Sequence, residues 1–527
     1  MDSKIKVEAG TYSSSAYEDQ SFLKMLLFSF EFSRLKQKRI GLRREVEGER
    51  SGMESGKDHF LYKFFYPESV AIVGASRNAF RANYHLVANL VKLGFAGKIY
   101  PVNPEAGDIL GLKVYPNLKS IDGHVDLAVI AVSYQTTPSL LKDCIEKGIQ
   151  NVVLVAGGFS ETGEEGRRVQ KEMAKLLKEN GVRAIGPNAL SPINTSTNLA
   201  ISFHPIDRMK VGGLSLIFQS GLYEPRIDWL FADFNLHLNK LIDLGNKMDI
   251  NEVDALTYLA QDSQTRVIGI HLESIEGDGR EFLRLLREAS RQKHVVVLKS
   301  GRTEAGARAV SSHTGVIVQG SDLVFEAALR QSGAIRAQTI EEFFDLTRAL
   351  ERFGSILLPG NRIAIATLPG GEAVIVTDHC QFAGLSLAKL PNEVLIKLRP
   401  IFPPWKISGN PFDLGVSLQF NDIRMVYSLL LESIVPDPGV DGIAVQFPSR
   451  ALALPRDFFQ VFPQALKFKK PIAVWVAGME SGRNETLAWL DDHHVPVFSC
   501  PEKAIRALSA LHRSSQFKTA KGIAQSA

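Results

Sequence analysis

The sequence predicts an α/β protein made of three consecutive parallel-sheet domains. Short runs of apolar residues recur along the chain and alternate with longer amphipathic or polar stretches, which is the pattern of successive βαβ units. These runs fall into three groups separated by turn-rich segments. The length of 527 residues also fits about three domains of ordinary size.

The composition is that of an ordinary soluble protein. Hydrophobic residues make up 45% of the chain, and 61 Lys and Arg nearly balance 57 Asp and Glu, so neither a nucleic-acid nor a membrane surface is predicted. No apolar run is long enough to span a membrane. The three cysteines, Cys144, Cys380 and Cys500, lie far apart without CxxC spacing. This predicts no disulfide framework and no metal site, and it indicates a reducing cytoplasm.

Residues 1–58 differ from the rest of the chain. Their apolar cluster at residues 22–32 is short, contains charges, and is followed by a strongly charged run at residues 34–50. A signal peptide has its charges before the apolar core. We therefore expect a disordered or misassigned N-terminal extension, with Met53 as a plausible true initiator.

Residues 59–195 are predicted to form the first, Rossmann-like domain. Its first strand leads into Gly74-Ala75-Ser76-Arg77, a turn that can present phosphate oxygens to a helix N-terminus. The turn lacks the full GxGxxG spacing, and Asn103 follows the second strand where an NAD domain carries an acidic residue. Arg77, with Arg81 nearby, favours a ligand with extra phosphate such as coenzyme A. Simple packing at a helix start is the alternative. The expected strands are residues 70–73, 98–102, 127–132, 152–155 and 183–185.

Residues 196–355 are predicted to form the second domain. Ser220-Gly221 stand at a strand-to-helix junction and are a candidate anion site. Glu273 follows the predicted strand at residues 267–272, and a carboxylate there can hold a histidine by one ring nitrogen. A solvated glutamate at the strand end is the alternative. Further strands are expected at residues 214–218, 241–245 and 294–299.

The strand at residues 294–299 is predicted to lead into a loop of small residues that contacts phosphate. Gly301, Gly306 and Gly315 permit close approach of the backbone, and Arg302 and Arg308 can bind phosphate oxygens. His313 lies between hydroxyl residues and Gly315, where a free imidazole can act as a nucleophile. A solvated surface histidine is the alternative reading.

Residues 356–515 are predicted to form a third parallel-sheet domain, followed by a tail at residues 516–527. Its expected strands are residues 362–367, 385–388, 442–446, 471–476 and 495–498. No GxxxxGK[ST] nucleotide motif occurs in the chain.

Several motifs together resemble the alpha-type part of ADP-forming acyl-CoA synthetases, the relatives of succinyl-CoA synthetase. The most specific is Ser-Gly-Arg-Thr-Glu-Ala-Gly-Ala-Arg, followed by Ser-Ser-His-Thr-Gly, within residues 299–315. The similarity covers about residues 60–511. It is carried also by Val-Gly-Ala-Ser-Arg (73–77), Gly-Pro-Asn (186–188), Phe-Gln-Ser-Gly (218–221) and Leu-Gly-Asn-Lys (244–247).

The resemblance implies a Rossmann-like CoA-binding domain followed by two flavodoxin-like ligase domains. It further implies that His313 is phosphorylated, that Glu273 orients it, and that Gly74, Ser76 and Arg77 belong to the CoA site. We expect Ser220, Gly221 and Gly315 to bind phosphate. One segment and one single residue depart from the family pattern: Leu-Tyr-Glu-Pro-Arg at residues 222–226 replaces a run of small residues, and Ala189 replaces a frequent cysteine.

The expected reaction is the reversible conversion of acyl-CoA, ADP and phosphate into a carboxylic acid, ATP and CoA, through an acyl phosphate and a phosphohistidine. The resemblance includes no ATP-grasp domain, so it implies a separate beta-type subunit that holds the nucleotide and Mg²⁺. A non-catalytic CoA-binding regulator or scaffold is the main alternative. A nicotinamide oxidoreductase is a weaker one, because it explains neither Asn103 nor the residues around His313.

Overall fold

The computed structural model describes residues 56–105, 107–219, 221, 223, 231, 233–314, 321–404, 409–449, 452, 454–477 and 485–523, with only the backbone of 311–314, 477 and 521–523. The chain divides into two units, residues 1–54 and 55–527, and everything described below belongs to the second. Most of the predicted N-terminal extension therefore lies outside the described residues. The described part begins with a turn that leads into α2 (Leu61–Phe65).

The first sheet has five strands in the order β2-β1-β5-β6-β7, all parallel. Every residue of β1 is buried, as expected for strands of a parallel sheet that helices cover on both faces. The strand order reverses between β1 and β5, and ligands of doubly wound sheets bind at this switch point. The elements are β1 (Ser69–Val73), α3 (Ala82–Leu93), β2 (Lys98–Val102), β3 (Asp108–Ile109), β4 (Leu112–Lys113), η1 (Leu118–Ser120), β5 (Leu127–Ile130), α4 (Thr137–Lys147), β6 (Asn151–Leu154), η2 (Ser160–Thr162), α5 (Glu164–Glu179) and β7 (Arg183–Ile185).

The second sheet has seven strands in the order β14-β13-β12-β10-β11-β8-β9. Strands β8 and β9 are antiparallel to their neighbours. They come from a segment in which no strand was predicted, and β8 extends the sheet beyond β11. The elements are β8 (Ile193–Asn194), β9 (Leu199–Ala200), β10 (Val211–Phe218), β11 (Leu238–Asp243), α7 (Glu252–Gln261), β12 (Val267–Leu272), α8 (Gly279–Ser290), β13 (His294–Lys299), α9 (Glu304–Thr314), α10 (Asp322–Ser332), β14 (Ile335–Ala337) and α11 (Ile340–Arg352).

The third sheet is parallel, with the order β16-β15-β18-β19-β20 and β17 paired with β15. Strands β15, β16, β18, β19 and β20 fall where the sequence predicted them, whereas β17 comes from a segment in which no strand was predicted. The elements are β15 (Arg362–Thr367), α12 (Gly370–Phe382), β16 (Ser386–Leu387), α13 (Asn392–Leu398), η4 (Arg399–Ile401), β17 (Phe412–Asp413), α14 (Leu414–Phe420), α15 (Ile423–Ile434), β18 (Gly442–Pro448), α16 (Arg456–Phe459), α17 (Val461–Ala465), η6 (Leu466–Phe468), β19 (Ile472–Ala477), α18 (Glu485–Asp492), β20 (Val497–Phe498) and α19 (Pro501–Ile523).

The three sheets share their cores in pairs. One apolar cluster combines Phe64 and Val153 of the first region with Ile242 and Leu256 of the second. Another combines Phe343 of the second region with Trp475 of the third. Apolar packing therefore joins each sheet region to the next.

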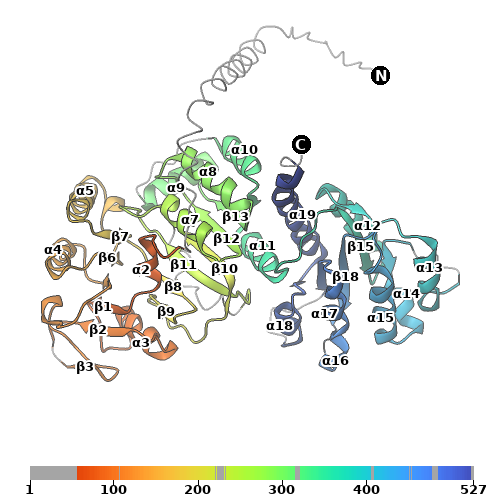
Figure 1. The fold of residues 1–527 in the computed structure, drawn as a ribbon, viewed down its shortest axis with the longest axis horizontal. Helices are drawn as coiled ribbons and strands as arrows, with labels where there is room; N and C mark the ends of the chain where they lie inside the picture. The colour runs from red at the N-terminus through yellow and green to blue at the C-terminus, as the bar shows by residue number, and fades with distance from the viewer. Residues whose placement is uncertain are drawn as a thin grey trace, which may run out of the picture. The chain divides into compact units, whose positions relative to one another are not determined.

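The last helix, α19, packs on both the second and the third sheet regions, against α11, α12 and β19 (Figure 1). Ser514 Oγ lies 2.7 Å from His294 Nδ1 in β13. A Cβ on Gly333 would meet the ring of Phe517. Residues 516–523, which were predicted as part of a tail, continue α19. The ring of Phe517 packs against Gly333 in this part of the helix.

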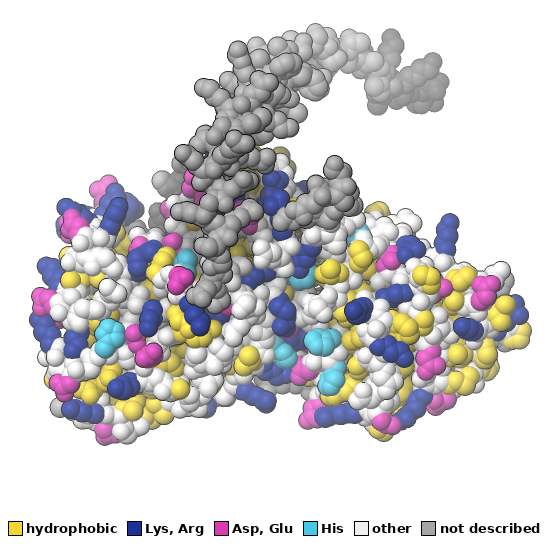
Figure 2. Space-filling model, viewed as in Figure 1, with side chains coloured by type: hydrophobic (Ala, Val, Ile, Leu, Met, Phe, Trp, Pro, Cys, Tyr) yellow, Lys and Arg dark blue, Asp and Glu magenta, His cyan; other side chains and the backbone are white. Residues whose placement is uncertain are grey.

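Charged side chains of both signs are interspersed on the face shown in Figure 2. Among the helices that the structure describes, none is long and apolar enough to cross a membrane.

Candidate active site

Gly74 directly follows β1 at the switch point of the first sheet. Its φ is +88°, and a Cβ there would lie 2.5 Å from Ala131 O and 2.8 Å from Val132 Cγ1. Its N–H donates to Val102 O at 2.9 Å. Only glycine fits this crossing without strain, because the backbone after β5 passes directly against it.

The turn at Gly74 does not lead straight into a helix, which corrects the sequence interpretation. Asn78 folds the chain into a further turn, where its side chain accepts from Phe80 N at 2.9 Å and its carbonyl accepts from Arg81 N at 2.9 Å. Ser76 Oγ accepts from Asn78 N at 3.1 Å. Helix α3 begins only at Ala82. Asparagine favours such turns because its side chain bonds the backbone two residues on.

Two arginines lie in or beside this turn. Arg77 is exposed and forms an ion pair with Glu105 at 3.5 Å. Arg81, the residue before α3, is also exposed. Solvated guanidinium groups next to a helix start are suited to binding phosphate oxygens.

Two asparagines hold the loops of the switch point together. Asn103 Nδ2 donates to Ala75 O at 2.8 Å, and Asn83 Nδ2 donates to Gly74 O at 2.9 Å and to Ala131 O at 2.7 Å. An acidic residue at position 103 has no such donor when ionised. Asn103, which argued against an NAD site in the sequence, therefore fixes the loop that contains Ala75.

Glu273 follows β12 directly and is 6% exposed. Gln219 Oε1 accepts from Glu273 N at 2.8 Å and from Ser274 N at 2.9 Å, and Lys299 Nζ donates to Glu273 O at 2.8 Å. Burial lowers the pKa of Lys299, although Asp322 and Glu273 oppose that shift. The backbone that carries the Glu273 carboxylate is therefore held from both neighbouring strands.

A buried histidine, His271, lies on β12 two residues before Glu273. His271 Nε2 is 2.7 Å from Ser300 Oγ at the end of β13. Burial, together with the charge of Lys299, lowers the pKa of His271 to about 4. His271 is therefore neutral at physiological pH, and it connects β12 to the residue before Gly301.

A fully buried ion pair supports the same edge, and sequence reasoning missed it. Lys247 Nζ lies 2.9 Å from Glu252 Oε2 and donates to Ser274 O at 3.0 Å. Glu252 Oε1 accepts from the backbone N–H groups of Glu276 and Gly277. Lys247 lay within a motif that carried the family resemblance, but nothing in the sequence indicated Glu252 as its partner.

His313 lies in the last turn of α9 (Glu304–Thr314), where a loop was predicted. Thr303 starts this helix: its Oγ1 accepts from Gly306 N at 3.0 Å, and its carbonyl accepts from Ala307 N at 2.7 Å. The three alanines of this helix favour a helical conformation, and so does the negative charge of Glu304 in its first turn. The small residues that suggested a loop thus also suit a helix.

The two arginines of this segment are engaged in ion pairs. Arg302 Nε lies 3.4 Å from Asp322 Oδ2, and Arg308 lies 3.9 Å from Glu304 on the exposed face of α9. Gly315 lies outside the described residues, and so does Ser220. Gly221 is described, and it is exposed.

The segment after Gly221 departs from the family pattern, and its Tyr223 is described. Tyr223 is 2% exposed, and its ring stacks on Phe218 with centroids 4.0 Å apart. Its ring also meets Phe344 edge to face. Residues 222 and 224–226 lie outside the described residues. The unusual tyrosine is therefore part of the core beneath the site.

The two regions that carry the predicted residues meet. Helix α9 contacts η2, which follows β6 of the first sheet. In addition, Asn246 N donates to Pro187 O at 2.8 Å, so the loop after β11 packs on the turn after β7. The structure thus brings the helix of His313 to the carboxyl edge of the first sheet, and it places Glu273 on the adjoining edge of the second.

Comparison with known proteins gives two matching family models. The model of a CoA binding domain matches residues 68–193, and that of a succinyl-CoA ligase like flavodoxin domain matches residues 211–350. The chain is 35% identical over 469 residues to the alpha subunit of acetate–CoA ligase [ADP-forming] I of Pyrococcus furiosus, covering 87% of this chain and 98% of that protein.

A longer relative and a solved structure agree with this. Acetate–CoA ligase [ADP-forming] II of Archaeoglobus fulgidus is 36% identical over 452 residues; the match covers 85% of this chain but only 66% of that protein. The dinucleotide forming acetyl-coenzyme A synthetase 1 of Ca. Korarchaeum cryptofilum, solved with phosphate and ADP, superposes with a TM-score of 0.79 at 30% identity. That alignment covers 88% of this chain and 98% of the other.

Proposed function

The chain belongs to the family of alpha subunits of ADP-forming acyl-CoA synthetases, and from this premise we propose that it interconverts acyl-CoA, ADP and phosphate with a carboxylic acid, ATP and CoA. The observation that carries the proposal is the contact between α9, which bears His313, and η2 at the carboxyl edge of the first sheet. A phosphoryl acceptor and a CoA domain must meet in this reaction.

The proposed division of labour follows the three sheets. Residues 59–195 form the CoA-binding domain, residues 196–355 the ligase domain that carries the phosphohistidine, and residues 356–515 a second flavodoxin-like domain. Gly74 lets the backbone approach CoA closely, Ser76 offers a hydroxyl, and Arg77 binds a phosphate of CoA. The solvated position of Arg77 supports this role.

In the proposed reaction, an oxygen of inorganic phosphate attacks the thioester carbonyl, and the C–S bond breaks to release CoA. A ring nitrogen of His313 then attacks the phosphorus of the acyl phosphate, and the carboxylate leaves. Glu273 accepts a hydrogen bond from the other ring nitrogen and stabilises the imidazolium character that develops. Ser220, Gly221 and Gly315 bind the phosphate. The phosphoryl group finally passes to an oxygen of ADP.

A separate ATP-grasp subunit of the beta type would hold the nucleotide, and Mg²⁺ bound there would support phosphoryl transfer by neutralising negative charge. The name of the P. furiosus relative as a subunit supports a partner chain. The extra length of the A. fulgidus relative fits the same idea. We place the protein in the cytoplasm, where its free thiols Cys144, Cys380 and Cys500 stay reduced.

Labelling with radioactive ATP and Mg²⁺, with and without a candidate ATP-grasp partner, tests this function. We expect label on the chain that is labile in acid and stable in alkali, and no label on the His313→Ala variant. Glu273→Gln should slow labelling about tenfold or more, since the orienting carboxylate is lost. CoA binding without any label in the presence of a cognate partner would instead indicate a CoA-binding regulator.

A further inference from the structure

The short helix η2 contains a carboxylate that bonds two segments far apart in the sequence. Glu161 Oε1 accepts from Gly158 N at 2.5 Å, and its Oε2 accepts from Asn246 Nδ2 at 2.7 Å. Gly158 follows β6 of the first sheet, and Asn246 follows β11 of the second. One side chain therefore connects the ligand-facing edges of both sheets.

The Asn246 side of this connection is rigid. Gly245 has a φ of +53°, and a Cβ there would lie 2.2 Å from Pro187 O. Lys247, the next residue after Asn246, donates to Ser274 O and forms the buried pair with Glu252. Since Ser274 is the neighbour of Glu273, the loop that receives the bond from Glu161 is fixed to the backbone of the proposed orienting residue.

The Gly158 side carries an exposed aromatic ring. Gly158 has a φ of +107°, and a Cβ there would lie 2.8 Å from the ring of Tyr134. That ring meets Phe159 edge to face and is 43% exposed. Tyr134 comes from the loop after β5, which borders the switch point of the first sheet. Glu161 therefore also fixes the glycine backbone on which this ring lies.

A carboxylate suits this position for a chemical reason. Both partners of Glu161 are N–H donors, and an ionised carboxylate offers two acceptor oxygens and no donor. Glutamine would direct an NH₂ group at one of the two donors and lose that bond. Gln170 Oε1 also accepts from Asn246 Nδ2, at the longer distance of 3.3 Å.

We propose that Glu161 is a positioning residue: it holds the CoA-binding loops of the first sheet in a fixed position relative to Glu273 and to α9. This inference rests on the proposed function. It requires that transfer between acyl-CoA and His313 depends on Glu161, because that half-reaction uses both sheets. Transfer between ATP on the partner subunit and His313 does not use the CoA loops, so it should not depend on Glu161.

The test measures phosphorylation of His313 from both directions in the full chain. One assay supplies acyl-CoA and labelled phosphate, and the other supplies labelled ATP, Mg²⁺ and the partner. For Glu161→Gln we expect the first rate to fall about 10- to 100-fold, as for a misplaced reacting group, and the second to stay within about twofold. Asn246→Ala removes the other end of the bond and should give the same split.

Glu165→Gln is the matched control. Glu165 is an exposed glutamate whose ion pair with Arg168 lies on the surface of α5, so both rates should stay at the wild-type level. Equal loss of both rates in the Glu161 and Asn246 variants, or no loss in either, would overturn the inference. If the wild-type chain is labelled by neither route, the proposed function itself fails. That result differs from one in which the wild type is labelled and the variants lose both rates equally or lose neither.

Discussion

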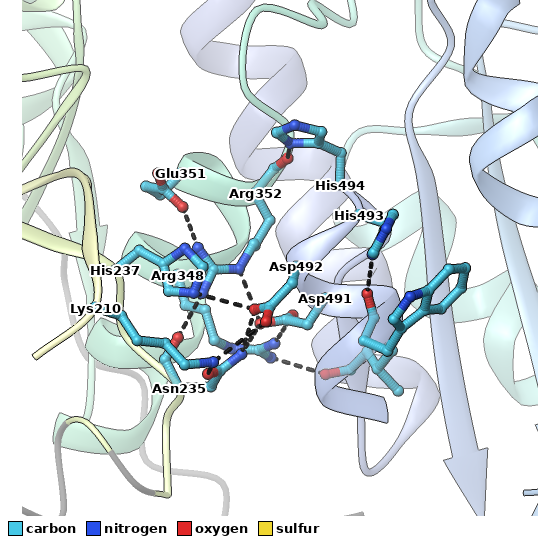
Figure 3. Close-up of polar contacts among 12 residues, drawn as sticks. Lys210, Asn235, His237, Arg348, Glu351, Arg352, Asp491, Asp492, His493 and His494 are labelled. Atoms are coloured by element: carbon cyan, nitrogen blue, oxygen red, sulfur yellow. Dashed lines mark hydrogen bonds and ion pairs between the residues drawn. The ribbon is translucent and has the colours of Figure 1, made fainter. Parts of the chain in front are cut away.

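The two junctions between the sheet regions are built from different chemistry. Between the first and second sheets, the polar contacts include hydrogen bonds to backbone carbonyls, the Glu161–Asn246 bond and a partly exposed ion pair of Arg183 with Asp249. Between the second and third sheets, they are made by a cluster of arginines and aspartates (Figure 3). Each junction also contains its own apolar core. The polar layers therefore distinguish them.

In the second junction, the charges satisfy one another. Asp491 of α18 binds Arg348 and Arg352 of α11, with Arg352 Nε 2.9 Å from Asp491 Oδ2. Arg348 also donates to Val497 O at 2.8 Å. All three side chains are less than 10% exposed. A network so enclosed fixes two domains, whereas the first junction leaves exposed residues such as Tyr134 and Arg77 at the sheet edge. This difference supports the proposal that ligands bind at the first junction and that the second junction is structural.

Breaking the charged junction should give the largest effect on stability. Arg352→Ala leaves Asp491 and Glu351 buried with less compensation, so we expect the free energy of unfolding to fall by about 3 to 5 kcal/mol. The charges of Asp491 and Glu351 raise the pKa of Arg352 against the opposing effect of burial, so the native arginine is always ionised. Urea denaturation of both proteins measures the change.

An exposed ion pair in the third sheet region serves as the control. Arg424 Nη1 lies 3.0 Å from Asp457 Oδ2, and both side chains are about half exposed or more. Arg424→Ala should therefore change the free energy of unfolding by less than about 1 kcal/mol. Similar effects for the two arginine variants would show that burial does not strengthen the junction as argued.

Much of this fold could be predicted from the sequence. The predominantly apolar runs at β1, β5, β12 and β18 are buried strands of parallel sheets, because such runs suit strands that are covered on both faces. Glu273 was expected after a strand, and it follows β12. The family was also recognised from local motifs, because those motifs are contiguous in the sequence.

The rest depends on contacts that local patterns do not contain. The small residues before His313 fit a loop or a helix equally well, and the hydrogen bonds that Thr303 accepts from Gly306 N and Ala307 N favour the helix α9. Strands β8 and β9 have two residues each, too few to show a periodicity. Glu161 and Asn246 are 85 residues apart, so only the packing of two sheets reveals their bond.

A single methyl group should disturb the first junction. In Gly245→Ala, the added Cβ meets Pro187 O at 2.2 Å, and φ is +53°. Strain and collision together should lower the free energy of unfolding by about 2 to 4 kcal/mol. The chain offers a control in Gly94, which has φ of +78° and nothing within 4 Å of its Cβ position. Gly94→Ala should cost only the conformational part, about 1 to 2 kcal/mol. Equal losses in urea denaturation would show that the loop yields to the methyl group.

The smallest effect concerns pH at the rim of the charged junction, where Asp492 contacts Lys210 and His237 at 3.2 and 3.0 Å. Burial opposes ionisation of Asp492, but hydrogen bonds from His237 and Asn235 and the charge of Lys210 outweigh it and lower its pKa. A lowered carboxyl pKa stabilises the folded state above the unfolded value of about 4, and that contribution is lost as pH falls below it.

The side chain of Asp492 is 35% exposed, so solvent reduces this contribution to less than about 1 kcal/mol. Asp492→Asn removes the charge, and the wild type should therefore unfold at a higher temperature than the variant at pH 6. Thermal unfolding at successively lower pH should show the gap closing below about pH 4. Below that pH the aspartate of the unfolded chain is protonated first, so the stabilisation by the native charge shrinks, and it is lost once native Asp492 is protonated as well. A gap that persists in acid would mean that the hydrogen-bond geometry of Asp492, and not its charge, supports this rim.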